Sequence, residues 1–154
     1  MRGLWIGLPV ALGLGSPALA MQEALTPMQR CALSDMVVAA EVTDIETLWA
    51  PGADGGLERH AHLNISTVFR GKGKTGTTVV LPGGQQGEFR HWVEDVPELE
   101  VDASYLLFLG HHDGRLVVIG GEAGAVRLAS PDRLSAGVSL EQASKALGGC
   151  DVAQ

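Results

Sequence analysis

Hydrophobic and polar residues alternate through segment 57–69, and this alternation constrains the fold more than any other feature of the chain. The alternate positions that begin at Leu57 are mostly apolar, whereas those that begin at Glu58 are mostly polar. A period of two indicates a β-strand with one buried face. At about 3.3 Å per residue the strand would be roughly 43 Å long, whereas the domain should measure only about 36 Å across. The strand must therefore bend, as strands do in small antiparallel barrels.

The other apolar segments predict further strands, and the 21 glycines of the chain favour many turns between them. Within Met36–Trp49 the inward-facing positions are even from Val38 to Val42 but odd at Ile45 and Trp49. A change of parity within one strand indicates a β-bulge or a sharp bend. Further strands are expected at 77–81, 88–93, 105–109, 115–119 and 125–128.

Two capping boxes predict one short helix near each end of the chain. Thr26 and Gln29 bracket the first, which should run from residue 27 to about residue 34. Ser139 and Gln142 open the second, which should stop at the glycine pair 148–149. The expected fold is therefore mainly β, with short N- and C-terminal helices.

Residues 1–20 have the organisation of a secretory signal peptide. Arg2 precedes an apolar run, and the small residues Ala18 and Ala20 occupy the positions that define a cleavage site. A membrane anchor is the weaker interpretation, because Pro9 and Pro17 interrupt the segment and no cationic stop-transfer sequence follows. We expect residues 21–154 to form a single domain in a secreted, periplasmic or cell-envelope location, with no membrane span after cleavage.

Cys31 and Cys150 are the only cysteines of the chain. They are too far apart in sequence for a redox Cys-x-x-Cys pair, so a structural disulfide is the preferred interpretation. The chain-entropy model gives roughly 4.9 kcal/mol for closing a loop of about 120 residues, as an upper value.

The charge of the chain argues against nucleic acid as a partner. The formal net charge is −7, and removal of residues 1–20 with Arg2 makes it −8. Phosphate binding needs a cationic surface. The acidic residues of segment 94–102 are best interpreted as a solvated loop, because nothing in the sequence separates the pKa values of two carboxyl groups for acid–base catalysis.

His60, His62 and Asn64 share the polar face of the long strand. The spacing of the two histidines could place both imidazoles on one metal ion, but zinc usually needs three or four ligands. The sequence does not bring His91 or the His111–His112 pair to this face, so exposed strand histidines are the simpler interpretation. We expect His60, His62 and Asn64 to form a partner-binding face, and we expect no cofactor.

Several short segments, taken in order, resemble the netrin-like domains, the group that includes the tissue inhibitors of metalloproteinases. The likeness covers the chain from about Cys31 to Cys150. Its motifs are Ser-Asp-Met-Val-Val at 34–38, Glu-Val at 41–42, Val-Phe-Arg-Gly-Lys at 68–72 and Tyr-Leu-Leu-Phe at 105–108. The resemblance implies a five-stranded Greek-key barrel of OB type.

One departure from that family bears on function. The inhibitors carry a Cys-x-Cys at the mature N-terminus that chelates the zinc of the protease, whereas this sequence has Met21, Gln22 and Glu23 there. The inhibitory mechanism therefore does not carry over. We expect a secreted, non-catalytic, monomeric module that binds a protein partner. The alternatives are a metalloproteinase-inhibitor-like protein with an altered reactive ridge, whose partner is a protease, and a small envelope enzyme, which would need a concave pocket with convergent polar groups.

Overall fold

A computed structural model describes residues 25–52, 55–130, 137–148 and 150. The expected signal peptide, residues 1–20, lies outside these ranges. Among the described residues, none of the helices has the length and apolar character needed to cross a membrane.

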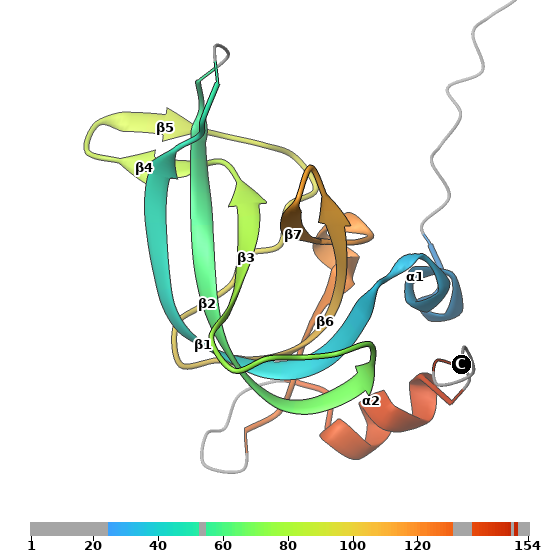
Figure 1. Ribbon diagram of the computed structural model, residues 1–154. Coiled ribbons are helices and arrows are strands. Elements are labelled where there is room, and N and C mark those ends of the chain that lie inside the picture. The colour runs from blue at the N-terminus through green and yellow to red at the C-terminus, as the bar shows by residue number, and fades with distance from the viewer. Residues whose placement is uncertain (1–24, 53–54, 131–136, 149, 151–154) are drawn as a thin grey trace, which may run out of the picture.

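The fold is mainly β, as predicted, and one curled antiparallel sheet dominates it (Figure 1). Its five main strands are β1 (Met36–Trp49), β2 (Leu57–Arg70), β3 (Thr77–Pro82), β6 (Ser104–His112) and β7 (Arg115–Val118). The smaller elements are α1 (Pro27–Leu33), β4 (Gly84–Gln86), β5 (Phe89–His91), η1 (Gly121–Gly124), β8 (Ala125–Arg127) and α2 (Leu140–Ala146). Both predicted capping boxes form, and they start α1 and α2.

The main strands lie in the order β3-β2-β1-β6-β7, while β8 pairs with β6 and β4 pairs with β5 in a separate hairpin. The curl brings the edge strands β3 and β7 to within 8 Å of each other between Cα atoms. No ladder of hydrogen bonds joins these two strands in the described sheet. The expected closed five-stranded barrel is therefore not confirmed: the mainly-β class holds, but the sheet stays open along this seam.

The predicted change of parity in β1 is present. The register between β1 and β2 shifts between Val42 and Asp44, so that Thr43 has no partner of its own. As a result Val42 and Ile45 both face the same core. The prediction that Trp49 also points inward is wrong, since Trp49 is 53% exposed. The last residue of β1 that pairs with β6 is Glu41. The end of β1 that carries Trp49 lies well beyond this residue and therefore extends past the core.

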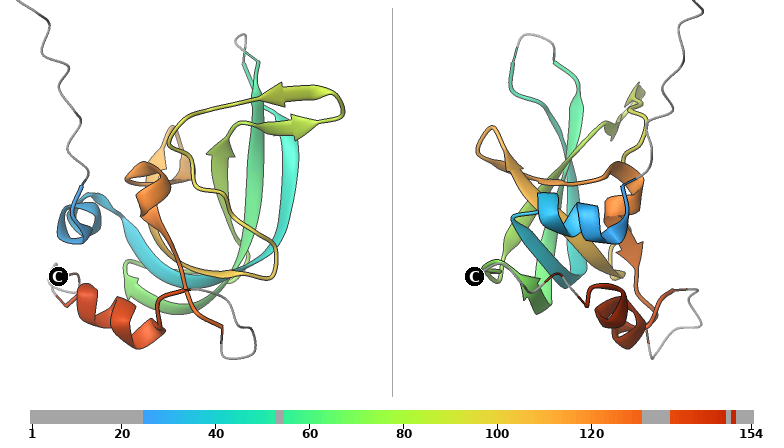
Figure 2. Two further views of the ribbon diagram at one scale, coloured as in Figure 1. Left: turned by 180° about the vertical axis from the view of Figure 1, so that it is seen from behind. Right: turned by 90° about the vertical axis from the view of Figure 1, so that its right-hand side faces the viewer.

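The sheet has a core on each of its two faces. One lies inside the curl and is built mainly from Val38, Ala40, Val42, Ala61, Leu63 and Leu107. The other lies between the outer face of β1 and β6 and the helices, and it includes Val37, Ala39, Phe108, Ala143 and Leu147. Figure 2 shows both helices on this one side of the sheet. Strand β6 is buried on both faces, which explains its continuous apolar run.

A disulfide joins Cys31 of α1 to Cys150 beyond α2, with Cα atoms 5.7 Å apart. Both cysteines are buried in the second core. The predicted pairing is confirmed, and it connects the two ends of the described domain.

Candidate functional site

Three exposed aromatic side chains lie on the end of β1 and on or next to β5. Trp49 ends β1, Phe89 begins β5 and Trp92 follows that strand; their exposed fractions are 53%, 47% and 68%. The ring centroids of Trp49 and Phe89 lie 4.8 Å apart. Large aromatic side chains usually gain by burial, so such a group on a surface indicates a place where another molecule binds. We call Trp49, Phe89 and Trp92 the aromatic end.

A pocket of about 180 Å³ lies beside Trp92. The end of β3 and the β4–β5 hairpin form much of its wall, and its charged lining residues are Arg59, Arg90 and Glu98. Sites for small-molecule ligands usually measure about 300–1,000 Å³. The pocket is therefore of a size for one side chain of a partner rather than for a whole metabolite.

Arg59 is the most distinctive polar group in this pocket. Its side chain is only 14% exposed, and its Nη1 donates to Oε2 of Glu98 at 2.8 Å. The Nε atom of Arg59 is buried and has no hydrogen-bond partner. The two arginines of the lining give the pocket a positive charge that Glu98 offsets only in part, so the pocket suits a group that brings an acceptor oxygen. Arg90 adds a second positive charge, with its guanidinium carbon 5.8 Å from the centroid of the Trp92 ring.

The β4–β5 hairpin is held over the start of β2 by hydrogen bonds to the backbone of Leu57. The amide of Leu57 donates to Nδ1 of His91 at 3.1 Å, and the amide of Gly83 donates to the carbonyl of Leu57 at 2.8 Å. Gly83 has a φ of +84°, and a Cβ there would lie 2.9 Å from the carbonyl oxygen of His91. A glycine is needed at this turn for both reasons. His91 is thus a residue that positions the hairpin.

His60, one of the predicted site residues, belongs to a charged network on the outer face of β2. Its Nε2 lies 2.7 Å from Oε1 of Glu58, and Arg115 of β7 donates to the other carboxylate oxygen of Glu58. Glu58 is only 6% exposed, although the alternating pattern placed it on the polar face. Burial raises the pKa of Glu58, but the hydrogen bonds from Arg115 and His60 outweigh that effect and leave the pKa below its ordinary value.

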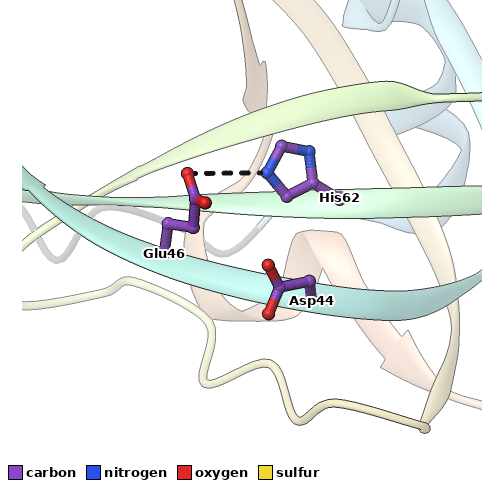
Figure 3. A group of neighbouring side chains, drawn as sticks. All are labelled: Asp44, Glu46 and His62. Carbon is purple, nitrogen blue, oxygen red and sulfur yellow. Dashed lines mark ion pairs between the residues drawn. The ribbon is translucent and has the colours of Figure 1, made fainter.

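The other two predicted site residues lie farther along β2. His62 meets Asp44 and Glu46 of β1, with its Nε2 3.9 Å from Oε2 of Glu46 (Figure 3). Asn64 is exposed and lies opposite Glu41. Within the described ranges, the one group of three or more potential metal ligands contains His62 but not His60. The remaining histidines lie elsewhere: His91 in the hairpin, and His111 and His112 in β6 beside Asp35 and Asp113.

The aromatic end was missed by sequence reasoning. Trp49 and Phe89 are forty positions apart, and only the fold of the hairpin brings them together. A usable signal was present, since Trp49 and Trp92 each stand next to a loop in a chain with few aromatic residues. No protein-family model matches this sequence, and no curated protein is significantly similar to it. What the chain does must therefore be inferred from these surfaces.

Proposed function

We propose that this protein is an exported, non-catalytic binding module that holds a protein partner at its aromatic end. The observation that carries the proposal is the exposure of Trp49, Phe89 and Trp92, of which Trp92 lines a pocket together with Arg59 and Arg90. Tryptophan and arginine are the residues that most often dominate the energy of protein interfaces. The site adjoins the start of the long strand, where Arg59 lines the pocket.

The pocket supports a partner that inserts an acidic side chain. A carboxylate could pair with the guanidinium of Arg90 and with the Nη1 of Arg59, both of which belong to residues that line the pocket. Glu98 now occupies one donor of Arg59, but its side chain is 74% exposed and can turn toward solvent. The ring of Trp92 in the pocket wall would contact the apolar surface next to that acidic residue.

We also propose that the sheet is an OB-type barrel of netrin-like kind with an open seam. The order β3-β2-β1-β6-β7 and the approach of β3 to β7 support this assignment, as does the disulfide between the terminal helices. OB barrels bind ligands on strands 2 and 3 and on the loops after strands 1 and 4. The pocket lies at the ends of β2 and β3, in agreement with that usage.

The test is affinity capture with the mature domain, residues 21–154, from the extracellular and envelope fractions of the source cells. A captured protein is then titrated against wild type and Trp92→Ala. Because interface tryptophans are often worth about 2 kcal/mol or more, we expect affinity to fall by roughly thirtyfold. Tryptophan fluorescence should also shift to shorter wavelength on binding, as the partner covers Trp92.

Leu33→Ala supplies a matched control, since Leu33 is 60% exposed on α1, away from the aromatic end. It should leave the affinity unchanged. Equal affinity of wild type and Trp92→Ala for the captured protein would contradict the proposed site. Failure to enrich any protein above a blank matrix would contradict the binding function. If the captured protein is a protease, an activity assay decides whether binding inhibits it.

A further inference from the structure

A second surface, separate from the aromatic end, combines an imidazole with two carboxylates. Asp44 and Glu46 project from β1, and His62 projects from the neighbouring strand β2 (Figure 3). One potential ligand atom from each residue lies within 4.8 Å of those of the other two. Glu46 and His62 have side chains 57% and 39% exposed, so this surface is open to solvent.

The β-bulge in β1 creates this arrangement. Asp44 lies directly opposite His62 because the register shifts between Val42 and Asp44. Without that shift, the alternation of β1 would place Asp44 on the other face of the sheet. The Oγ1 of Thr43 also donates to the carbonyl of His62 at 3.1 Å, which holds the two strands together at the bulge.

His62 is oriented by a neighbour that is not itself a potential ligand. Thr78 of β3 lies directly opposite His62, and its Oγ1 is 3.0 Å from Nδ1 of the imidazole. This contact occupies Nδ1 and turns Nε2 toward Glu46, at 3.9 Å from its Oε2. That separation is too long for a hydrogen bond. A partner on one ring nitrogen with the other nitrogen free is the usual arrangement of a metal-binding histidine.

The charges also favour a cation at this position. Two carboxylates lie together, and the carboxylate of Asp44 makes no hydrogen bond or ion pair with another described residue. Tetrahedral zinc, with ligand bonds of about 2.0–2.2 Å, separates its ligand atoms by roughly 3.4 Å. Small rotations of the exposed Asp44 and Glu46 side chains would close the present spacing to that value.

We propose that Asp44, Glu46 and His62 bind a divalent transition-metal ion, with zinc the best fit. One imidazole nitrogen and two carboxylate oxygens match the ligand preference of zinc, whereas calcium and magnesium prefer shells made of oxygen alone. Three protein ligands leave at least one coordination position open for water or for a group of another molecule. His60 is not a ligand, because its Nε2 is bound to Glu58.

Isothermal titration calorimetry of the chelator-treated mature protein with zinc sulfate tests this site. We expect one zinc ion per chain, and at least a tenfold loss of affinity in His62→Gln and in Asp44→Asn. Thr78→Val keeps every ligand but removes the orienting hydroxyl, so its affinity should fall by about tenfold. In NMR spectra, zinc should shift the Nε2 resonance of His62.

His112→Gln is the matched control, since His112 is an exposed histidine with Asp113 3.4 Å away, outside the site. His60→Gln tests whether His60 binds the metal ion together with His62, as their spacing in the sequence would allow. Both variants should bind zinc as wild type does. The site is overturned if no saturable binding appears up to about 1 mM zinc, if His62→Gln binds as tightly as wild type, or if His60→Gln loses the ion.

Discussion

Glu58 is the residue at which tertiary contacts depart most from the sequence pattern. The alternation placed it on a solvated face, yet its side chain is 7% exposed and lies between Arg115 and His60. A carboxylate can be buried in this way only when charged donors replace its lost water. The lowered pKa of Glu58 reports that replacement.

Glu58→Gln should reduce the free energy of unfolding at pH 7 by about 1–3 kcal/mol, because a neutral amide replaces a buried, charge-assisted pair. The folded-state pKa of Glu58 lies below its ordinary value of 4.5. The pair therefore stabilises the protein fully above pH 4.5 and loses this effect as pH falls through the folded-state pKa. Urea denaturation at neutral pH and at acidic pH should show the two proteins converge in acid.

Glu100→Gln is the control for this experiment. Glu100 also pairs with an arginine, Arg127, at 2.8 Å, but its side chain is 64% exposed. Exposed pairs contribute little, so the control should change stability by less than about 1 kcal/mol. A Glu58→Gln protein as stable as wild type at pH 7 would mean that the buried pair contributes no net stability.

At the scale of the elements, the turn that ends β2 depends on a close backbone approach. Gly71 has a φ of +78°, and a Cβ there would collide with the carbonyl oxygen of Asp35 and lie 3.2 Å from the Cα of Met36. Gly76 has almost the same φ, +80°, but a Cβ there would meet nothing within 4 Å. A comparison of the two glycines therefore separates the cost of a left-handed backbone conformation from the cost of a steric collision.

Gly71→Ala should destabilise the protein more than Gly76→Ala. Both variants carry the cost of a left-handed alanine, about 1–2 kcal/mol, and only the first adds a collision with the start of β1. Thermal unfolding of the two variants provides the comparison. Equal melting temperatures would show that β2 and β1 can separate at this turn without cost.

The capping box of α2 gives a second prediction at this scale. Ser139 accepts from the amide of Gln142 at 3.1 Å, and Gln142 accepts from the amide of Ser139 at the same distance. Ser139→Ala should cost about 1 kcal/mol in urea denaturation. Ser144→Ala, an exposed substitution within the same helix, should be neutral or slightly stabilising. A smaller loss of unfolding free energy in Ser139→Ala than in Ser144→Ala would contradict the role of the cap.

At the scale of the whole molecule, the disulfide connects segments 119 positions apart. It joins the two helices that cover the second core, where Phe108 is the largest fully buried side chain. The cross-link restricts the unfolded chain and holds this layer against the sheet. An exported location, which we propose, would keep the bond oxidised.

Replacement of Cys31 and Cys150 by serine should lower the free energy of unfolding by about 2–5 kcal/mol. The measurement is chemical denaturation of the double variant beside the oxidised wild type. Wild type treated with a reducing agent should approach the stability of the variant. A double variant as stable as the oxidised protein would show that packing of the helices alone holds the second core.

Local interactions determined much of this protein directly from its sequence. The period of two in β2, the capping boxes that start α1 and α2 and the parity change of β1 each depend on residues close together in the chain. The cysteine pair was also predictable, because only two cysteines exist. These features fix their own conformation or partner with little help from the rest of the fold.

Only the tertiary structure decided the features that depend on register and on distant neighbours. The bulge at Thr43 decides that Asp44 meets His62, and the hairpin decides that Trp49 meets Phe89. The open seam between β3 and β7 is likewise a property of the whole curl. A one-residue change of register moves a side chain to the opposite face, so alternation alone cannot say which polar residues will meet.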